Sequence, residues 1–88
     1  MEIVDGFIAV AIPFIVSICP HHDGWGVIVH GGREATEADG GIVAKHFAQS
    51  IDEAKAWASA ELGRRWEYAG GPPKLHWEHL VCNPQEIP

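Results

Sequence analysis

Residues 14–30 follow the two-residue period of a β-hairpin, in which one side of each strand is apolar. The apolar side consists of Phe14, Val16, Ile18, Trp25, Val27 and Val29. Between the two runs, Pro20 and the Asp23–Gly24 pair are typical turn residues. The pattern predicts two antiparallel strands joined by a tip of about five residues, 20–24, with one face directed to the core.

Two further stretches are typical of strands. Residues 3–12 are rich in β-branched side chains, and Pro13 separates them from the hairpin because proline cannot donate a hydrogen bond to a sheet. This stretch is either a separate strand or the first half of one broken edge strand. Glycine pairs at 31–32 and 40–41 then enclose a polar loop, and the run Ile42–Phe47 is short enough to be another strand.

The clearest helix signal begins at Ser50. Ser50 and Glu53 match the capping box S-x-x-E, whose two side chains accept hydrogen bonds from backbone amides at the helix start. Apolar residues then recur at helical spacing. They are Ile51, Ala54, Ala58, Leu62 and Trp66. The pattern predicts one helix from Ile51 to about Trp66, whose apolar side packs on the sheet.

After this helix, the Gly-Gly-Pro-Pro run at 70–73 forces a turn, and Leu75–Cys82 is expected to return as a closing strand. The element order is β-β-β-α-β, with an additional N-terminal strand if residues 3–12 stand alone. This order predicts an α+β fold, with a small antiparallel sheet of four to five strands and one helix packed on one face. The 88 residues are expected to form a single domain, 1–88.

The charge of the chain bears on its partners. Twelve Asp and Glu residues outnumber six Lys and Arg, which gives a formal net charge of −6. A phosphate backbone would be repelled by this average field, so direct nucleic-acid binding is disfavoured. The charge instead suits a partner protein with a basic surface. The densest local acidity is Glu34, Glu37 and Asp39 in the polar loop.

The expected location is the cytoplasm, or the host cytoplasm if the gene is carried by a phage. The longest apolar run, Phe7–Ile18, has twelve residues, fewer than the roughly 20 that cross a bilayer as a helix, so no membrane association is predicted. No secretory leader pattern is visible at the N-terminus, and Cys19 and Cys82 fit no disulfide framework. We therefore expect two reduced thiols.

The chain also contains residues of the types that bind zinc, in two clusters. They are Cys19, His21 and His22, and His76, His79 and Cys82. On a strand, residue 79 points away from 76 and 82, so the β alternation divides the second cluster. Two juxtapositions stay open: Cys19 with Cys82, and His76 with the His21–His22 turn. We expect structural roles for these residues and no cofactor, with a metal site of Cys19, His21, His22, His76 and Cys82 as the alternative.

No catalytic motif accompanies these residues. A cysteine and a histidine can form a nucleophilic pair, but no nucleophile elbow or oxyanion loop is present. The glycine pairs at 31–32 and 40–41 match no phosphate-binding fingerprint. We predict that the protein is not an enzyme.

Two motifs resemble those of the N-terminal domain of HicB-type antitoxins. Residues 23–27, Asp-Gly-Trp-Gly-Val, match a D-G-x-x-V hairpin strand, and residues 50–54, Ser-Ile-Asp-Glu-Ala, match a helix opening T-x-E-E-A. The resemblance covers residues 14–74, although the middle loop lacks the D-L-P-G-C-like stretch of that family. It implies a non-enzymatic domain that blocks a nucleic-acid-handling partner by binding it.

In general character the chain is also similar to small acidic α+β inhibitors encoded by phages, notably anti-CRISPR proteins. We therefore predict a viral anti-CRISPR or related anti-defence inhibitor that acts by occlusion. The alternatives are a HicB-like antitoxin domain that binds a small ribonuclease toxin, and a zinc-binding module. A homodimer through an unpaired sheet edge is a further expectation.

The predicted partner-binding surface combines the acidic loop with the start of the helix. It consists of Glu34, Glu37, Asp39, Asp52, Glu53 and Trp57. Trp57 lies at the edge of the apolar side of the helix, and aromatic residues with an acidic rim commonly carry interface energy. The competing interpretation is a tryptophan at the margin of the core.

Overall fold

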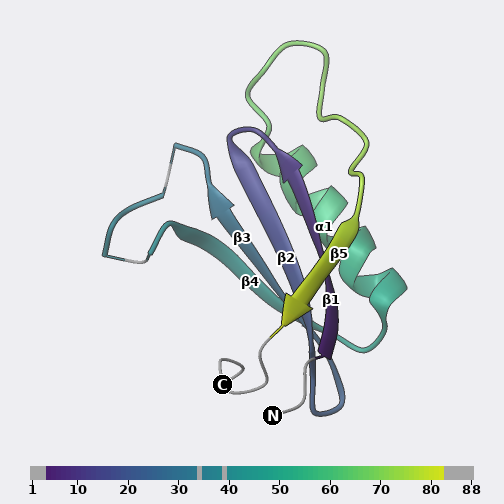
Figure 1. The fold of residues 1–88 in the computed structure, drawn as a ribbon. Helices are drawn as coiled ribbons and strands as arrows, with labels where there is room; N and C mark the ends of the chain where they lie inside the picture. Colours follow the sequence, from purple (N-terminus) through teal and green to yellow (C-terminus); the bar gives the residue numbers. More distant parts are fainter. Residues whose placement is uncertain (1–3, 34, 39, 83–88) are drawn as a thin grey trace.

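The computed structural model describes residues 4–33, 35–38 and 40–82, which form one sheet and one helix (Figure 1). The elements are β1 Val4–Ala11, β2 Phe14–His21, β3 Gly24–Gly31, β4 Ile42–Ala48, α1 Ile51–Arg65 and β5 Glu78–Cys82. Neighbouring strands are antiparallel throughout, in the order β4-β3-β2-β1-β5. The predicted α+β fold with one helix is confirmed, and β1 is a strand of its own.

The β2–β3 hairpin is tighter than predicted. Its turn consists of His22 and Asp23 alone, not of five residues, and Pro20 lies within β2 as a paired strand residue. Proline is tolerated there because β1 pairs with β2 only as far as Ile18. At Pro20 the missing amide hydrogen therefore costs no ladder bond on the β1 side.

The closing strand is shorter than predicted, because β5 begins at Glu78 and not at Leu75. Leu75 and Trp77 precede the strand and pack, half-buried, against the core. Because these two side chains pack on the core, residues 75–77 do not pair with β1, and the pairing of β5 with β1 begins at Glu78.

The core lies between α1 and one face of the sheet. On the sheet, alternate residues of β2 and β3 are buried, as the two-residue period predicts. They are Phe14, Val16, Ile18, Val27 and Val29. On the helix, Ala54, Ala58 and Leu62 are buried against them, and the two alanines allow α1 to approach the sheet closely. The predicted apolar side of the helix is confirmed.

The start of α1 is capped as its sequence predicts. The Glu53 amide donates to Ser50 Oγ over 3.1 Å, and the Glu53 carboxylate accepts from the Gln49 amide. The Ser50 half of the capping box is therefore formed, and Glu53 reaches back to the amide of Gln49, the residue before the cap, instead of to that of Ser50. Asp52 and Glu53 in the first turn and Arg64 and Arg65 in the last turn match the helix dipole.

The side of the sheet away from α1, called the outer face below, carries apolar side chains as well. The pairing registers place large ones there, among them Ile8, Val10, Ile15, Ile28, Phe47 and Leu80. Val10, Ile15 and Phe47 are 59%, 42% and 46% exposed. Within the described ranges no helix or strand covers this face (Figure 1). The sheet is thus apolar on both sides but packed on only one.

A disulfide joins Cys19 of β2 to Cys82 of β5 on the outer face. The prediction of two reduced thiols is therefore wrong. The two cysteines are 63 residues apart, and they meet because β5 returns beside β1, which in turn lies beside β2. Gly6 of β1 lies directly at the bond, since a Cβ there would overlap the Cys82 sulfur.

Candidate partner-binding surface

An aromatic pair lies where α1 meets the edge strand β4. The Trp57 indole stacks on the His46 imidazole, with ring centroids 4.7 Å apart and planes 8° from parallel. Both residues are half-buried, and Trp57 packs against the margin of the core. The stack therefore leaves part of an aromatic surface open to solvent beside a strand with one unpaired edge.

Two carboxylates lie in the first turn of α1, before Trp57. Asp52 and Glu53 are exposed, and Glu53 lies one helical turn before Trp57 on the same side of the helix. The Glu53 carboxylate also caps the helix, whereas that of Asp52 has no structural contact of this kind. We call Asp52, Glu53, Trp57 and His46 the helix-end surface. It combines an aromatic anchor with an acidic rim, as the sequence predicts for three of the four residues.

The acidic loop lies elsewhere. Glu37 is exposed in the loop between β3 and β4, whereas Glu34 and Asp39 lie outside the described residues. This loop precedes β4 and α1 follows it. The seven residues of β4 span about 23 Å at roughly 3.3 Å per residue. The structure therefore separates Glu37 from the helix-end surface instead of forming one contact patch.

The predicted metal residues do not form a site. The sulfurs of Cys19 and Cys82 are bonded to each other. His21 and His22 are neighbours at the hairpin turn, with ring centroids 5.5 Å apart. His76 precedes β5, whose other end lies near that turn, so the second open juxtaposition is not formed. Among the described residues, no three His, Cys, Asp or Glu side chains gather in a way that could hold a metal ion.

Two side-chain contacts of histidines are not predicted by the sequence. His46 stacks on Trp57, and His79 Nε2 lies 2.6 Å from Asp5 Oδ1 across β5 and β1. Both depend on which strands or helix become neighbours, and no local motif carries that information. The His79–Asp5 pair is exposed on both sides, so its contribution to stability is small.

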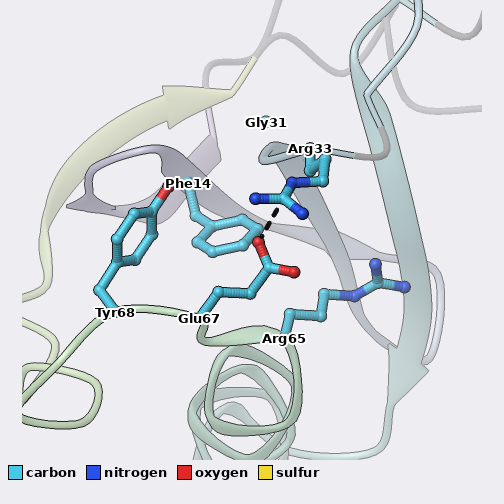
Figure 2. Close-up of a pocket in the computed structure, with 6 residues that line it drawn as sticks. All are labelled: Phe14, Gly31, Arg33, Arg65, Glu67 and Tyr68. Carbon is cyan, nitrogen blue, oxygen red and sulfur yellow. Dashed lines mark ion pairs between the residues drawn. The ribbon is translucent and has the colours of Figure 1, made fainter.

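A small cavity opens where the end of α1 meets the start of the β3–β4 loop (Figure 2). Phe14, Gly31, Arg33, Arg65, Glu67 and Tyr68 line it. Its volume is about 70 Å³, far below the roughly 300–1,000 Å³ of typical small-molecule sites. Arg33 Nε lies 3.5 Å from Glu67 Oε2, and Arg65 donates to Glu61 and to the Val43 carbonyl oxygen. The cavity is thus a small gap between the end of α1 and the β3–β4 loop, lined in part by charged side chains.

Two arginines at the end of α1, Arg64 and Arg65, lower the pKa of the Glu61 carboxyl. Burial would raise the pKa of the Glu61 carboxyl, but hydrogen bonds from Arg65 and Arg64 and their positive charges together hold this pKa below 4.5. The folded-state pKa therefore lies below that of the unfolded chain. The carboxylate stabilises the fold above about pH 4.5, and this contribution is lost as the pH falls through the folded-state pKa.

The variant Glu61→Gln is accordingly expected to lose about 1 kcal/mol of unfolding free energy at pH 7, because it removes charge-assisted hydrogen bonds from two arginines. The difference from the unmodified protein should shrink as the pH is lowered from 5 to 3. Urea denaturation across this range measures it. Glu37→Gln, in the exposed loop, is the control and should leave the free energy of unfolding unchanged. If the stability lost in Glu61→Gln were the same at every pH, the ion-pair role would be contradicted.

Comparison of the chain with family models, curated proteins and solved structures found no match. The resemblance to HicB-type antitoxins and the similarity to anti-CRISPR inhibitors therefore remain predictions. In the part of the chain that the structure describes, no helix is long and apolar enough to span a bilayer.

Proposed function

We propose that the protein is a non-enzymatic inhibitor that binds a nucleic-acid-handling partner protein and occludes its basic surface, as a phage anti-CRISPR or related anti-defence protein does. The observation that carries the proposal is the helix-end surface. There a half-buried tryptophan is held flat against His46 beside exposed carboxylates. Rigid aromatic side chains at the centre of an interface commonly supply most of its binding energy.

The charge distribution supports this partner class. The net charge of −6 attracts a basic surface over a distance of about one Debye length, roughly 8 Å at physiological ionic strength. Glu53 adds negative charge one helical turn from Trp57, where a lysine or arginine of the partner would lie, and Asp52 adds a second negative charge at the same end of α1. Electrostatic attraction of this kind raises the association rate, and contacts of the half-buried Trp57 with the partner would slow dissociation.

The HicB-like alternative shares this mode of action and differs in the partner, a small ribonuclease toxin. The hairpin at Asp23–Gly24 and the capped helix at Ser50, on which the resemblance depends, are both formed in the structure. The disulfide argues against the zinc-binding alternative, because neither sulfur is then available as a thiolate ligand.

The disulfide bears on the location of the proposed inhibitor. Disulfides persist in oxidising compartments and are reduced in most cytosols. An inhibitor that acts in the cytoplasm must therefore keep its fold with Cys19 and Cys82 reduced. The proposal consequently requires that the reduced protein remains folded and binds its partner.

The proposal is tested with two purified enzymes, a DNA-cleaving CRISPR effector complex and a small ribonuclease toxin of the kind that HicB-type antitoxins bind. The unmodified protein is expected to inhibit cleavage by at least one of them at equimolar concentration. Trp57→Ala and Asp52→Lys should each weaken binding at least tenfold, measured as Kd by biolayer interferometry. The first removes the aromatic anchor, and the second reverses an exposed charge at the same end of α1.

Glu37→Lys is the matched control for Asp52→Lys. It changes the net charge by the same amount at an exposed position beyond the other end of β4. It should change the Kd less than twofold, and Trp57→Phe, which keeps an aromatic ring, should retain most of the affinity. Uninhibited cleavage by both enzymes at tenfold molar excess, or equal effects of the two lysine variants, would overturn the proposal.

A further inference from the structure

The outer face contains a row of five residues, one from each strand, that reads across the whole sheet. The registers pair Lys45 with Ile28, Ile28 with Ser17, Ser17 with Ile8, and Ile8 with Glu78. The row therefore runs from a positive charge on β4, through an apolar residue, a small residue and a second apolar residue, to a negative charge on β5.

This row is complementary to its own reverse. The small residue Ser17 lies on β2, the middle strand of the five. A two-fold axis parallel to the strands and passing over Ser17 would bring two outer faces together. Lys45 of one copy would then face Glu78 of the second copy, and Ile28 would face Ile8. An isologous interface requires this kind of self-complementary surface.

The neighbouring rows also place apolar residues opposite one another. On one side, Phe47 of β4 and Leu80 of β5 lie at opposite edges, one level from Lys45 and Glu78. Gly26 lies between them on β3. The reversed copy would set Phe47 against Leu80, and Cys19 of β2, which pairs with Gly26 and is bonded to Cys82, would meet its own counterpart at the axis. On the other side, Ile15 of β2 lies next to the axis and would meet its own counterpart.

Charge is otherwise kept off this face. Lys45 and Glu78 are the fully charged side chains that the described strands place on it. Asp52, Glu53 and Glu61 lie on α1, and Asp23 and Glu37 lie in turns and loops. The net charge of −6 on each copy is therefore not concentrated on the outer face, where the described strands place one negative and one positive side chain.

The area is sufficient for a weak, specific dimer. Four strands of seven or eight residues and the five-residue β5, about 4.8 Å apart and with a rise of about 3.3 Å per residue, present about 500–600 Å² per copy. The dimer would bury about 1,000–1,200 Å², the lower limit for a stable protein interface. Aligned sheets pack within about 30°, which shifts the ends of a row by about 5 Å, an offset that the Lys45 side chain can span.

We propose that the outer face binds a second copy of this chain, forming a face-to-face homodimer in which Lys45 of each copy pairs with Glu78 of the other. The proposal goes beyond the inhibitor function and uses a different surface. It also replaces the predicted homodimer through a sheet edge with one through a sheet face.

Sedimentation equilibrium between 1 µM and 1 mM, in about 0.15 M salt, tests the proposal. The unmodified protein is expected to dimerise with a micromolar Kd. Lys45→Glu and Glu78→Lys should each weaken the dimer at least tenfold, because each places like charges opposite one another. The double variant Lys45→Glu, Glu78→Lys should regain a Kd within threefold of the unmodified protein, since the swapped charges meet again across the two-fold axis.

Lys74→Glu is the control, because it makes the same charge change in an exposed loop off the outer face. It should leave the Kd within twofold. Ile15→Asp, at an exposed position, should abolish the dimer while the far-ultraviolet circular dichroism spectrum stays unchanged. A monomer at 1 mM, or a double variant as weak as the single ones, would overturn the proposal. Trp57→Ala should not affect the dimer, so the two proposals can fail separately.

Discussion

Replacing both Cys19 and Cys82 by alanine is expected to lower the free energy of unfolding by about 4 kcal/mol. The disulfide closes a loop of 63 residues, and restricting so long a loop in the unfolded chain has an effect of about this size. A domain of this length has a total stability of roughly 4–13 kcal/mol. The change should therefore remove a large part of the stability. Urea denaturation followed by tryptophan fluorescence measures it.

Reduction provides the control for this prediction. A thiol reductant should lower the stability of the unmodified protein by a similar amount and should not affect the double alanine variant. Equal stabilities of the oxidised and reduced protein would contradict a stabilising role for the bond. An unfolded double variant at 37 °C would rule out an inhibitor that acts in a reducing cytoplasm, because the proposed function requires a folded reduced form.

Gly6→Ala is expected to lower the free energy of unfolding by about 3 kcal/mol, the upper part of the range for overpacking a well-packed site. An added Cβ would overlap the Ile18 carbonyl oxygen of the neighbouring strand and the Cys82 sulfur. Neither can move easily, because Ile18 lies in the central strand and Cys82 is held by its disulfide. Chemical denaturation of the oxidised protein measures the effect.

Gly26→Ala is the matched control. Gly26 also lies in a strand on the outer face, but a Cβ there would meet its nearest atoms only at 3.9 Å. The free energy of unfolding of the Gly26→Ala variant should differ from that of the unmodified protein by less than about 0.5 kcal/mol. In the background without cysteines, Gly6→Ala should cost less than in the oxidised protein, since one of the two overlaps is gone. The same cost in both backgrounds would mean that the disulfide does not lie against Gly6.

Local signals in the sequence predicted the elements well. The capping box at Ser50 placed the start of α1 at Ile51, as observed. The two-residue period of β2 and β3 identified the buried side of the hairpin. These features depend on residues a few positions apart, so the chain itself contains the information that determines them. The tip of the hairpin was misplaced because Pro20 is tolerated where β1 no longer pairs.

The features that depend on strand order could not be predicted in the same way. The Cys19–Cys82 bond was one of two open juxtapositions, and only the place of β5 beside β1 decides between them. The stack of His46 on Trp57 depends on the register of β4 under α1. The row from Lys45 to Glu78 likewise exists only once all four strand registers are known.

The disulfide also changes what a break in the backbone does to the molecule. The two longest connections, residues 32–41 and 66–77, both lie between Cys19 and Cys82, within the covalent ring that the bond closes. Loops of this kind are the usual places of proteolytic cleavage. A single cut in either connection leaves the two fragments covalently linked through the disulfide. Cleavage of the oxidised domain in either connection therefore releases no fragment until the disulfide is reduced.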